Sequence, residues 1–183
     1  MPYSPIFQEK VTEAASIILF HAHGKMSYLK LIKLLYLADR KALEQWEVPI
    51  TYDTYASLPH GPVGSGTCDL ARGLVEDAQY WEQYIETVGM DVRIKGEYPK
   101  IRKLSRDEIA LIEEIYFKYR HYTKYQLAEL TEKLPEWRNP GESSYPLPLE
   151  DILQKGFQLN IGEVKRIRSE VMQNSELDVL LSV

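Results

Sequence analysis

Three side chains that could perform acid–base chemistry lie within a short part of the sequence. His60 follows Asp39 and Asp53, and an imidazole beside carboxylates can exchange protons near neutral pH. Cys68 follows His60 at a spacing that a nucleophilic thiol–imidazole pair could adopt. No local signature marks a third residue that would orient such a pair. The sequence therefore favours a hydrogen-bonded core histidine and a buried structural thiol over a catalytic centre.

Two other patterns argue against a metal site and a phosphate-binding loop. His21 and His23 would share one side of a strand, but on a helix their side chains point about 200° apart. Residues 61–66 contain three glycines, but no Lys-Ser/Thr pair follows them as in a P-loop. Their spacing also differs from the GxGxxG order of a dinucleotide-binding turn. We therefore expect no metal, no cofactor and no catalytic residue.

Residues 30–40 and 49–63 must position these side chains. At 3.6 residues per turn, the first stretch forms a helix with Asp39 on its apolar side. An unpaired buried carboxylate is costly, so Asp39 should bind the second stretch, through His60 or the free N–H groups of a helix that begins at Pro62. The expected polar face consists of Lys30, Lys33, Arg40, Lys41 and Glu44, and the apolar face of Tyr28, Ile32, Leu35, Leu43 and Trp46.

The same two stretches carry three motifs. They are a Lys-Leu-hydrophobic-Tyr-hydrophobic-Ala-Asp helix, a Pro-Ile-x-x-Asp-x-Tyr-Ala strand and a Gly-Pro-Val helix start. These motifs resemble the Panacea domain of SocA-like and GepA-like proteins, over about residues 10–137. Near the end of the pattern, Thr131 and Glu132 stand where such domains often have a Ser/Thr-His pair before a Trp. The signature residues are Lys33, Tyr36, Asp39, Asp53, Tyr55, His60, Gly61, Pro62 and Val63.

The resemblance implies an antitoxin of a bacterial or phage toxin–antitoxin system, which neutralises a cognate toxin by direct protein–protein binding. Some relatives instead act as adaptors that deliver the toxin to a protease. In either case the resemblance implies no cofactor, no chemistry of the antitoxin's own and a structural role for the signature residues. Two other classes stay open: a small hydrolase or transferase centred on His60, Asp39 and Cys68, and a DNA-binding autoregulator that uses residues 93–106.

Length and charge narrow these classes. With 183 residues and 44% hydrophobic content, the chain can bury one core, which predicts a single domain over 1–183. Its signature core covers about 10–137, and a helical extension covers 148–183. A net charge of −5 argues against a general nucleic-acid binder, because phosphate contact needs clustered Lys and Arg. The single Cys excludes an internal disulfide, and the start of the chain has no membrane-spanning run, so we expect a cytoplasmic protein without membrane contact.

Capping and breaking residues predict an α+β, mainly α-helical fold of about six to eight helices. Two capping boxes, Ser105 to Glu108 and Thr123 to Gln126, each open a helix. Alternating β-branched and aromatic residues predict a small antiparallel sheet near 50–58 and 84–103, whereas 139–148 should be a loop. The expected helices cover 5–22, 28–47, 63–80, 106–119, 124–134, 148–155 and 160–173.

Charged and aromatic residues indicate candidate partner surfaces. Residues 76–91 hold five acids and no Lys or Arg, whereas residues 93–106 hold six basic residues and one Glu. These segments are either solvated strand edges or a surface on which charge steers a partner. Tyrosines recur at every third residue from 116 to 125. Their side chains are either half-buried in the fold or exposed as anchors for a protein partner. The candidates are Tyr80, Trp81, Tyr84, Arg93, Lys95, Lys100, Arg102, Tyr116, Tyr119, Tyr122 and Tyr125. The apolar segment 177–183 is either a last helical turn that packs on the fold or a mobile tail that a protease or partner recognises.

Overall fold

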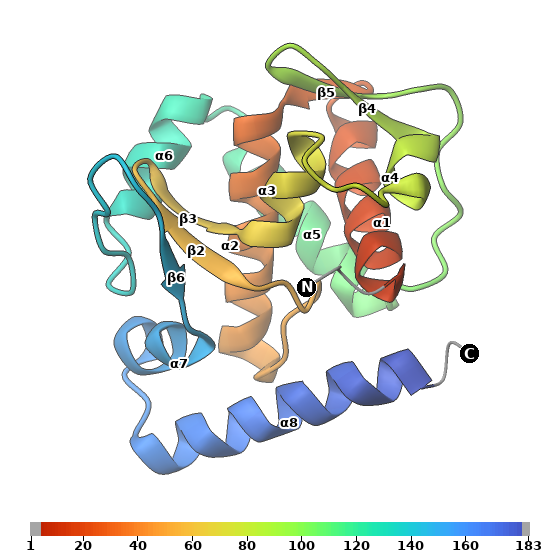
Figure 1. Cartoon of the computed structure of the whole chain (residues 1–183). Coiled ribbons are helices and arrows are strands. Elements are labelled where there is room, and N and C mark those ends of the chain that lie inside the picture. Colours follow the sequence, from red (N-terminus) through yellow and green to blue (C-terminus); the bar gives the residue numbers. More distant parts are fainter. Residues whose placement is uncertain (1–4, 181–183) are drawn as a thin grey trace.

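Three long helices form the centre of the fold. The computed structural model describes residues 5–180, and α1 (Pro5–His21), α2 (Tyr28–Trp46) and α5 (Arg106–Tyr119) lie side by side in it (Figure 1). Their apolar sides face one another because each helix has aliphatic residues at helical spacing. The core between them includes Val11, Ile18, Leu31, Leu34 and Ile112. The fold is therefore α+β and mainly helical, as the sequence predicts.

Shorter helices surround this centre. They are α3 (Ser65–Ala71), α4 (Gln79–Tyr84), α6 (Lys124–Glu132), α7 (Leu149–Asp151), which continues as a π-helix (Ile152–Gly156), and α8 (Ile161–Leu180). The single helix expected over 63–80 is wrong. Its first residues form a strand, and Gly73, with a φ of +68°, lies in the turn after α3. The last helix also extends beyond the expected end at Gln173.

The described residues contain two three-stranded antiparallel sheets instead of the one that was expected. The first has the order β1 (Lys25–Ser27), β5 (Asp91–Ile94) and β4 (Ile85–Val88). The second has the order β3 (Gly61–Gly64), β2 (Tyr55–Leu58) and β6 (Tyr145–Leu147).

Three strand predictions need correction. The strand near 50–58 pairs with β3 and β6, so it does not join the 84–103 region. Residues 100–103 form no strand, because a carboxylate binds the backbone N–H groups of residues 102–104. The expected loop 139–148 contains strand β6, which pairs with β2 in register Ser57 to Tyr145. The prolines and the glycine of this segment are uncommon in strands, so its composition is typical of a loop.

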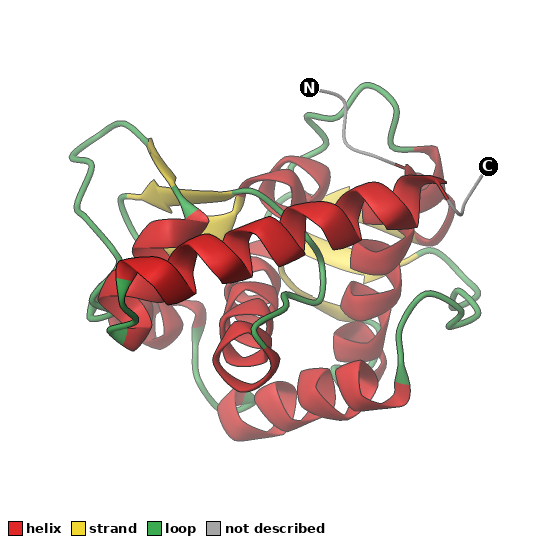
Figure 2. Ribbon diagram, turned by 90° about the horizontal axis from the view of Figure 1, so that it is seen from below, coloured by secondary structure: helices red, strands yellow, loops and turns green. Residues whose placement is uncertain are grey.

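Helix α8 is the outermost element and lies across one side of the rest of the fold (Figures 1 and 2). Val164 and Ile167 on its inner side pack against Leu153 of the π-helix. Two ion pairs support this contact, Arg166 with Glu47 and Arg168 with Glu150. Of the apolar segment 177–183, Leu177 is 54% exposed in α8, and residues 181–183 lie outside the described residues.

Candidate functional site

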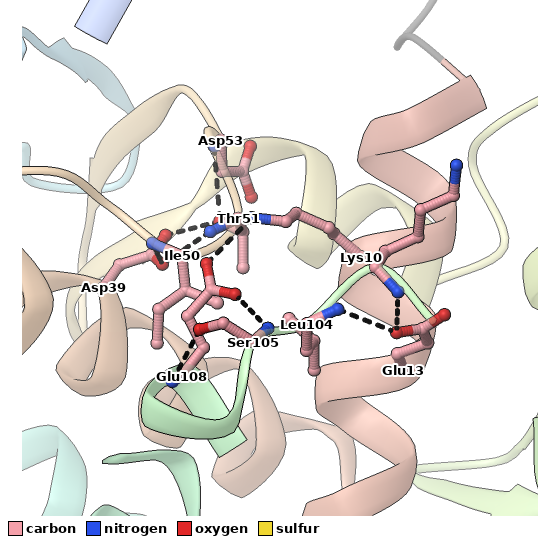
Figure 3. A network of polar contacts seen from close by, with 10 residues as sticks. Lys10, Glu13, Asp39, Ile50, Thr51, Asp53, Leu104, Ser105 and Glu108 are labelled. Atoms are coloured by element: carbon pink, nitrogen blue, oxygen red, sulfur yellow. Dashed lines mark hydrogen bonds and ion pairs between the residues drawn. The ribbon is translucent and has the colours of Figure 1, made fainter. Parts of the chain in front are cut away.

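The carboxylate of Asp39 is buried where α2 meets the segment that leads into β2 (Figure 3). Its Oδ1 accepts hydrogen bonds from the backbone N–H groups of Ile50 at 3.0 Å and Thr51 at 2.9 Å. Its Oδ2 accepts from the Thr51 hydroxyl and from the Tyr55 hydroxyl, the latter at 3.1 Å. Burial raises the pKa of Asp39, and these hydrogen bonds act in the opposite direction. Asp39 thus joins the two signature stretches, as expected.

The expected partners of Asp39 were wrong. Pro62 lies in β3, so no helix begins there. His60 has a side chain that is 80% exposed, and its Nδ1 lies 3.6 Å from Glu132 Oε1. The prediction failed because the turn between β2 and β3 carries His60 away from the core, while the chain just after Pro49 returns to α2.

Asp53 performs the capping role that we assigned to Asp39. Its carboxylate accepts hydrogen bonds from the N–H groups of Gly66 at 2.8 Å and Thr67 at 2.9 Å, in the first turn of α3. The Thr67 hydroxyl donates a third bond at 2.8 Å. Burial raises the pKa of Asp53 to about 7, against the effect of these bonds. A Cβ on Gly64 would collide with this carboxylate, which explains a glycine at that position.

Lys33 is buried, although we placed it on the polar face of its helix. It is 4% exposed, and its Nζ donates a hydrogen bond to the Pro62 carbonyl at 3.0 Å. The helical-wheel prediction failed because β3 and α6 cover this side of α2. Burial lowers the pKa of Lys33 to about 7, while Glu132 and Cys68 act in the opposite direction. Gly61 lies above the ammonium group with a φ of +99°.

A buried ion pair between Arg40 and Glu136 was not predicted. Glu136 is 1% exposed and binds Arg40, with Nε to Oε1 at 2.6 Å and Nη2 to Oε2 at 3.2 Å. The hydroxyl of Tyr36 donates to the same Oε1 at 3.0 Å. This geometry assigns Tyr36, a signature residue, to the junction of α2 with the chain after α6. A sequence separation of about 100 residues gives no local signal for the contact.

Glu13 is, after Glu136, a second buried carboxylate that the sequence did not reveal. It lies in α1 with 1% exposure and accepts hydrogen bonds from the N–H groups of Arg102, Lys103 and Leu104. Figure 3 shows the bond from Leu104. A Glu among apolar residues of a helix was the only available signal. The remaining signature residues, Tyr55 and Val63, are buried beside these contacts.

The side chains of the catalytic alternative are not brought together. Asp39 binds the Ile50–Thr51 backbone, whereas the exposed His60 faces Glu132. Cys68 is buried in the core, and burial raises the pKa of its thiol, which disfavours the thiolate nucleophile. Among the described residues, no group of three His, Cys, Asp or Glu side chains could hold a metal ion.

Burial divides the candidate partner residues. Trp81 is 2% exposed and Tyr116 is 9% exposed, so both belong to the core and leave the candidate surface. Tyr80, Tyr84 and Tyr119 are half-buried. The exposed candidates are Arg93, Lys95, Lys100, Arg102, Tyr122 and Tyr125.

The basic segment 93–106 is partly neutralised within the fold. Arg93 pairs with Glu86 at 2.7 Å, and Lys103 pairs with Glu9 at 3.1 Å. Lys95 donates to the Glu82 carbonyl. These contacts leave fewer free cations for phosphate than the sequence indicates, which disfavours the DNA-binding alternative.

Comparison with known proteins identifies the family. The chain matches the family described as antitoxin SocA-like, Panacea domain, over residues 31–138. No curated protein and no solved structure matches the chain. None of the described helices is both long enough and apolar enough to cross a membrane. The family match spans more than half of the chain and supports an antitoxin-type role. The chain therefore belongs to the family of SocA-like antitoxins with a Panacea domain.

Proposed function

We propose that the protein is an antitoxin that neutralises a cognate toxin by direct protein–protein binding in the cytoplasm. The family match over residues 31–138 carries this proposal. The matched region holds most of α2 together with β2 and β3, where Lys33, Asp39 and Tyr55 bind one another or the backbone inside the fold. The outer surfaces of the helices are then left to recognise a partner.

The satisfied state of the buried polar groups supports binding over catalysis. Among the described buried side-chain nitrogen and oxygen atoms, Ser27 Oγ is the one without a hydrogen-bond partner. Catalytic centres usually keep acids, bases or donors free to meet a substrate. Asp39, Asp53 and Lys33 each form hydrogen bonds with backbone groups or neighbouring hydroxyls.

Co-expression with the adjacent open reading frame tests the proposal. The neighbour alone should arrest growth, and the two proteins together should restore growth and copurify. A neighbour that is harmless alone, or that stays toxic beside this protein, would contradict the proposal.

The half-life of the toxin distinguishes direct inhibition from delivery to a protease. Direct binding should leave the half-life of the toxin unchanged or longer after synthesis is blocked. A shortened half-life that depends on this protein would instead assign it the adaptor role, with a cellular protease as the second partner.

A further inference from the structure

The end of α5 and the start of α6 have an unusual composition for an acidic protein. Residues 116–128 contain five Tyr or Phe residues and three Lys or Arg residues, with no Asp or Glu. The chain as a whole has a net charge of −5. Aromatic residues and Arg are the types that dominate binding energy at protein interfaces.

Exposed rings connect this segment to the end of α1. Tyr98 meets Phe20 edge to face, with ring centroids 5.6 Å apart. Phe20 contacts His21 at 5.4 Å, and His21 contacts Phe117 at 4.8 Å. Phe20 is 62% exposed, Phe117 47% and Tyr98 39%, so three large rings along this row face solvent. A connected row of exposed aromatic rings is a feature of binding surfaces.

Arg120 lies at the Phe117 end of this row, and Lys124 follows four residues later in the chain, at the start of α6. The Arg120 guanidinium lies 5.6 Å from the Phe117 ring centroid, and Lys124 Nζ lies 5.2 Å from that of Tyr125. Tyr125 is 74% exposed. Among the described residues, no ion pair joins Arg120 or Lys124 to an acid, whereas Arg93 and Lys103 each have one.

The two acids that precede this end of α5, Glu113 and Glu114, form no ion pair with Arg120 or Lys124. The nearest acid along α5 with a known contact is Glu113, whose carboxylate binds His21 Nε2 at 2.9 Å. Lys30 donates to the Arg120 carbonyl at 2.7 Å and adds a further positive charge beside Arg120. The positive charge at this end of the row is therefore available to an external anion.

We propose that Phe20, Tyr98, Phe117, Arg120, Lys124 and Tyr125 form one aromatic–basic face that binds an acidic segment of the toxin. This inference rests on the proposed function, which supplies the toxin as partner. The acidic side chains of the segment pair with Arg120 and Lys124, and its apolar side chains cover the rings.

Charge favours a polypeptide over a nucleic acid as the occupant. Nucleic-acid affinity depends on many phosphate contacts, and this face offers only a few cations, Arg120 and Lys124 with Lys30 nearby, beside the acid Glu113. Phe20 and Tyr98 also contact each other edge to face, whereas base stacking needs open ring faces. An acidic segment with a few carboxylates and apolar side chains matches both features.

A synthetic probe tests the face without the toxin. The probe is a 12-residue peptide of Glu interleaved with Leu and Trp, titrated into the ¹⁵N-labelled full chain. Saturable shifts should appear at the amides around Phe20 and over 117–125, and they should weaken with added salt. The same peptide with Lys in place of Glu should produce none. Shifts confined to other regions, or tighter binding of a single-stranded oligonucleotide, would overturn the proposal.

Charge reversal has a matched control in this chain. The double variant R120E/K124E should weaken peptide binding by about tenfold or more, because two favourable charge pairs become repulsive. K100E/R102E changes the same residue types at exposed positions in the other basic segment, and it should bind as the wild type does. Equal weakening by both pairs would show only an effect of net charge and would refute the face.

The toxin itself provides the second arm. In co-expression, R120E/K124E should fail to restore growth while K100E/R102E succeeds, with both variants folded by circular dichroism. If the wild-type protein does not neutralise the neighbour, the proposed function fails, and the peptide mapping still decides the face. If neutralisation persists in R120E/K124E, the face is wrong and the antitoxin function stands.

Discussion

Asp39 is the residue on which the signature stretches depend. Its carboxylate accepts two backbone and two hydroxyl hydrogen bonds in a buried site. We expect Asp39→Asn to lower the free energy of unfolding by about 2–4 kcal/mol, because an amide NH₂ would face buried donors. Urea unfolding followed by circular dichroism measures the loss. Asp77→Asn, at an exposed position, should change stability by less than about 0.5 kcal/mol, and a similar loss in both variants would contradict the buried role of Asp39.

Gly61 should tolerate substitution far less than another glycine with positive φ. Both Gly61 and Gly141 have positive φ, so Ala costs about 1–2 kcal/mol at either position through backbone strain. At Gly61 the added Cβ would also lie 2.8 Å from Lys33 Nζ and would collide with Thr131, whereas nothing lies within 4 Å at Gly141. Gly61→Ala should therefore cost about 1–3 kcal/mol more than Gly141→Ala in the same urea titration. Equal costs would mean that Lys33 and Thr131 move aside freely.

Lys33 should make stability depend on pH above neutrality. Its pKa is about 7 in the folded protein and 10.5 in the unfolded chain. Between these values the unfolded state binds more protons, so stability rises with pH, by at most about 1.4 kcal/mol per unit. Lys33→Met should remove this rise between pH 7.5 and 10. The informative quantity is the difference between the wild-type and variant unfolding free energies at each pH, and a constant difference would contradict the shift.

Single residues were predictable where their constraint is local. A carboxylate on the apolar side of a helix indicates burial, and Asp39 is indeed buried. Its partners were not predictable, since the path of residues 49–63 depends on a turn that places Pro62 in a strand. Contacts such as Arg40 with Glu136 join segments nearly 100 residues apart, and nothing in either local sequence pairs them.

At the scale of elements, Glu13 ties the segment before α5 to α1. Three N–H groups, those of residues 102–104, donate to its carboxylate. Glu13→Gln should release this segment and increase trypsin cleavage after Arg102 and Lys103, because proteases cut backbone that can open. Glu9→Gln, which removes only the surface partner of Lys103, is the matched control. Mass spectrometry of the early fragments reports the sites, and unchanged cleavage in Glu13→Gln would refute the tether.

Helix ends were more predictable than strand pairing. The capping boxes at Ser105 and Thr123 are present with both reciprocal hydrogen bonds, because they depend on residues three apart. The sheets depend on distant partners, as in the pairing of β1 with β5 and of β2 with β6. Strand β1 has three residues and was not predicted at all. The Gly-Pro-Val motif predicts a helix start, whereas these residues pair with β2 as strand β3 and the helix begins only at Ser65.

At the scale of the whole molecule, we propose that residues 1–183 unfold as one domain to which α8 contributes little. Its packing rests on a small cluster around Leu153, apart from the main core, and on exposed ion pairs. Exposed pairs are worth about 0–1 kcal/mol. A chain that ends at residue 159 should keep one cooperative thermal transition at a slightly lower midpoint. Two transitions in the full chain, or loss of cooperativity on truncation, would contradict this.

The buried carboxylates have a consequence for sequence drift. Asp39, Asp53 and Glu13 bind main-chain N–H groups of Ile50, Gly66 and residues 102–104, among others. Every amino acid except proline supplies such a group. The side chains of residues 102 and 103 can therefore change over generations while Glu13 keeps its bonds, whereas Leu104 is also fixed by its burial in the core. Surface segments anchored in this way can diversify toward new partners without loosening the scaffold.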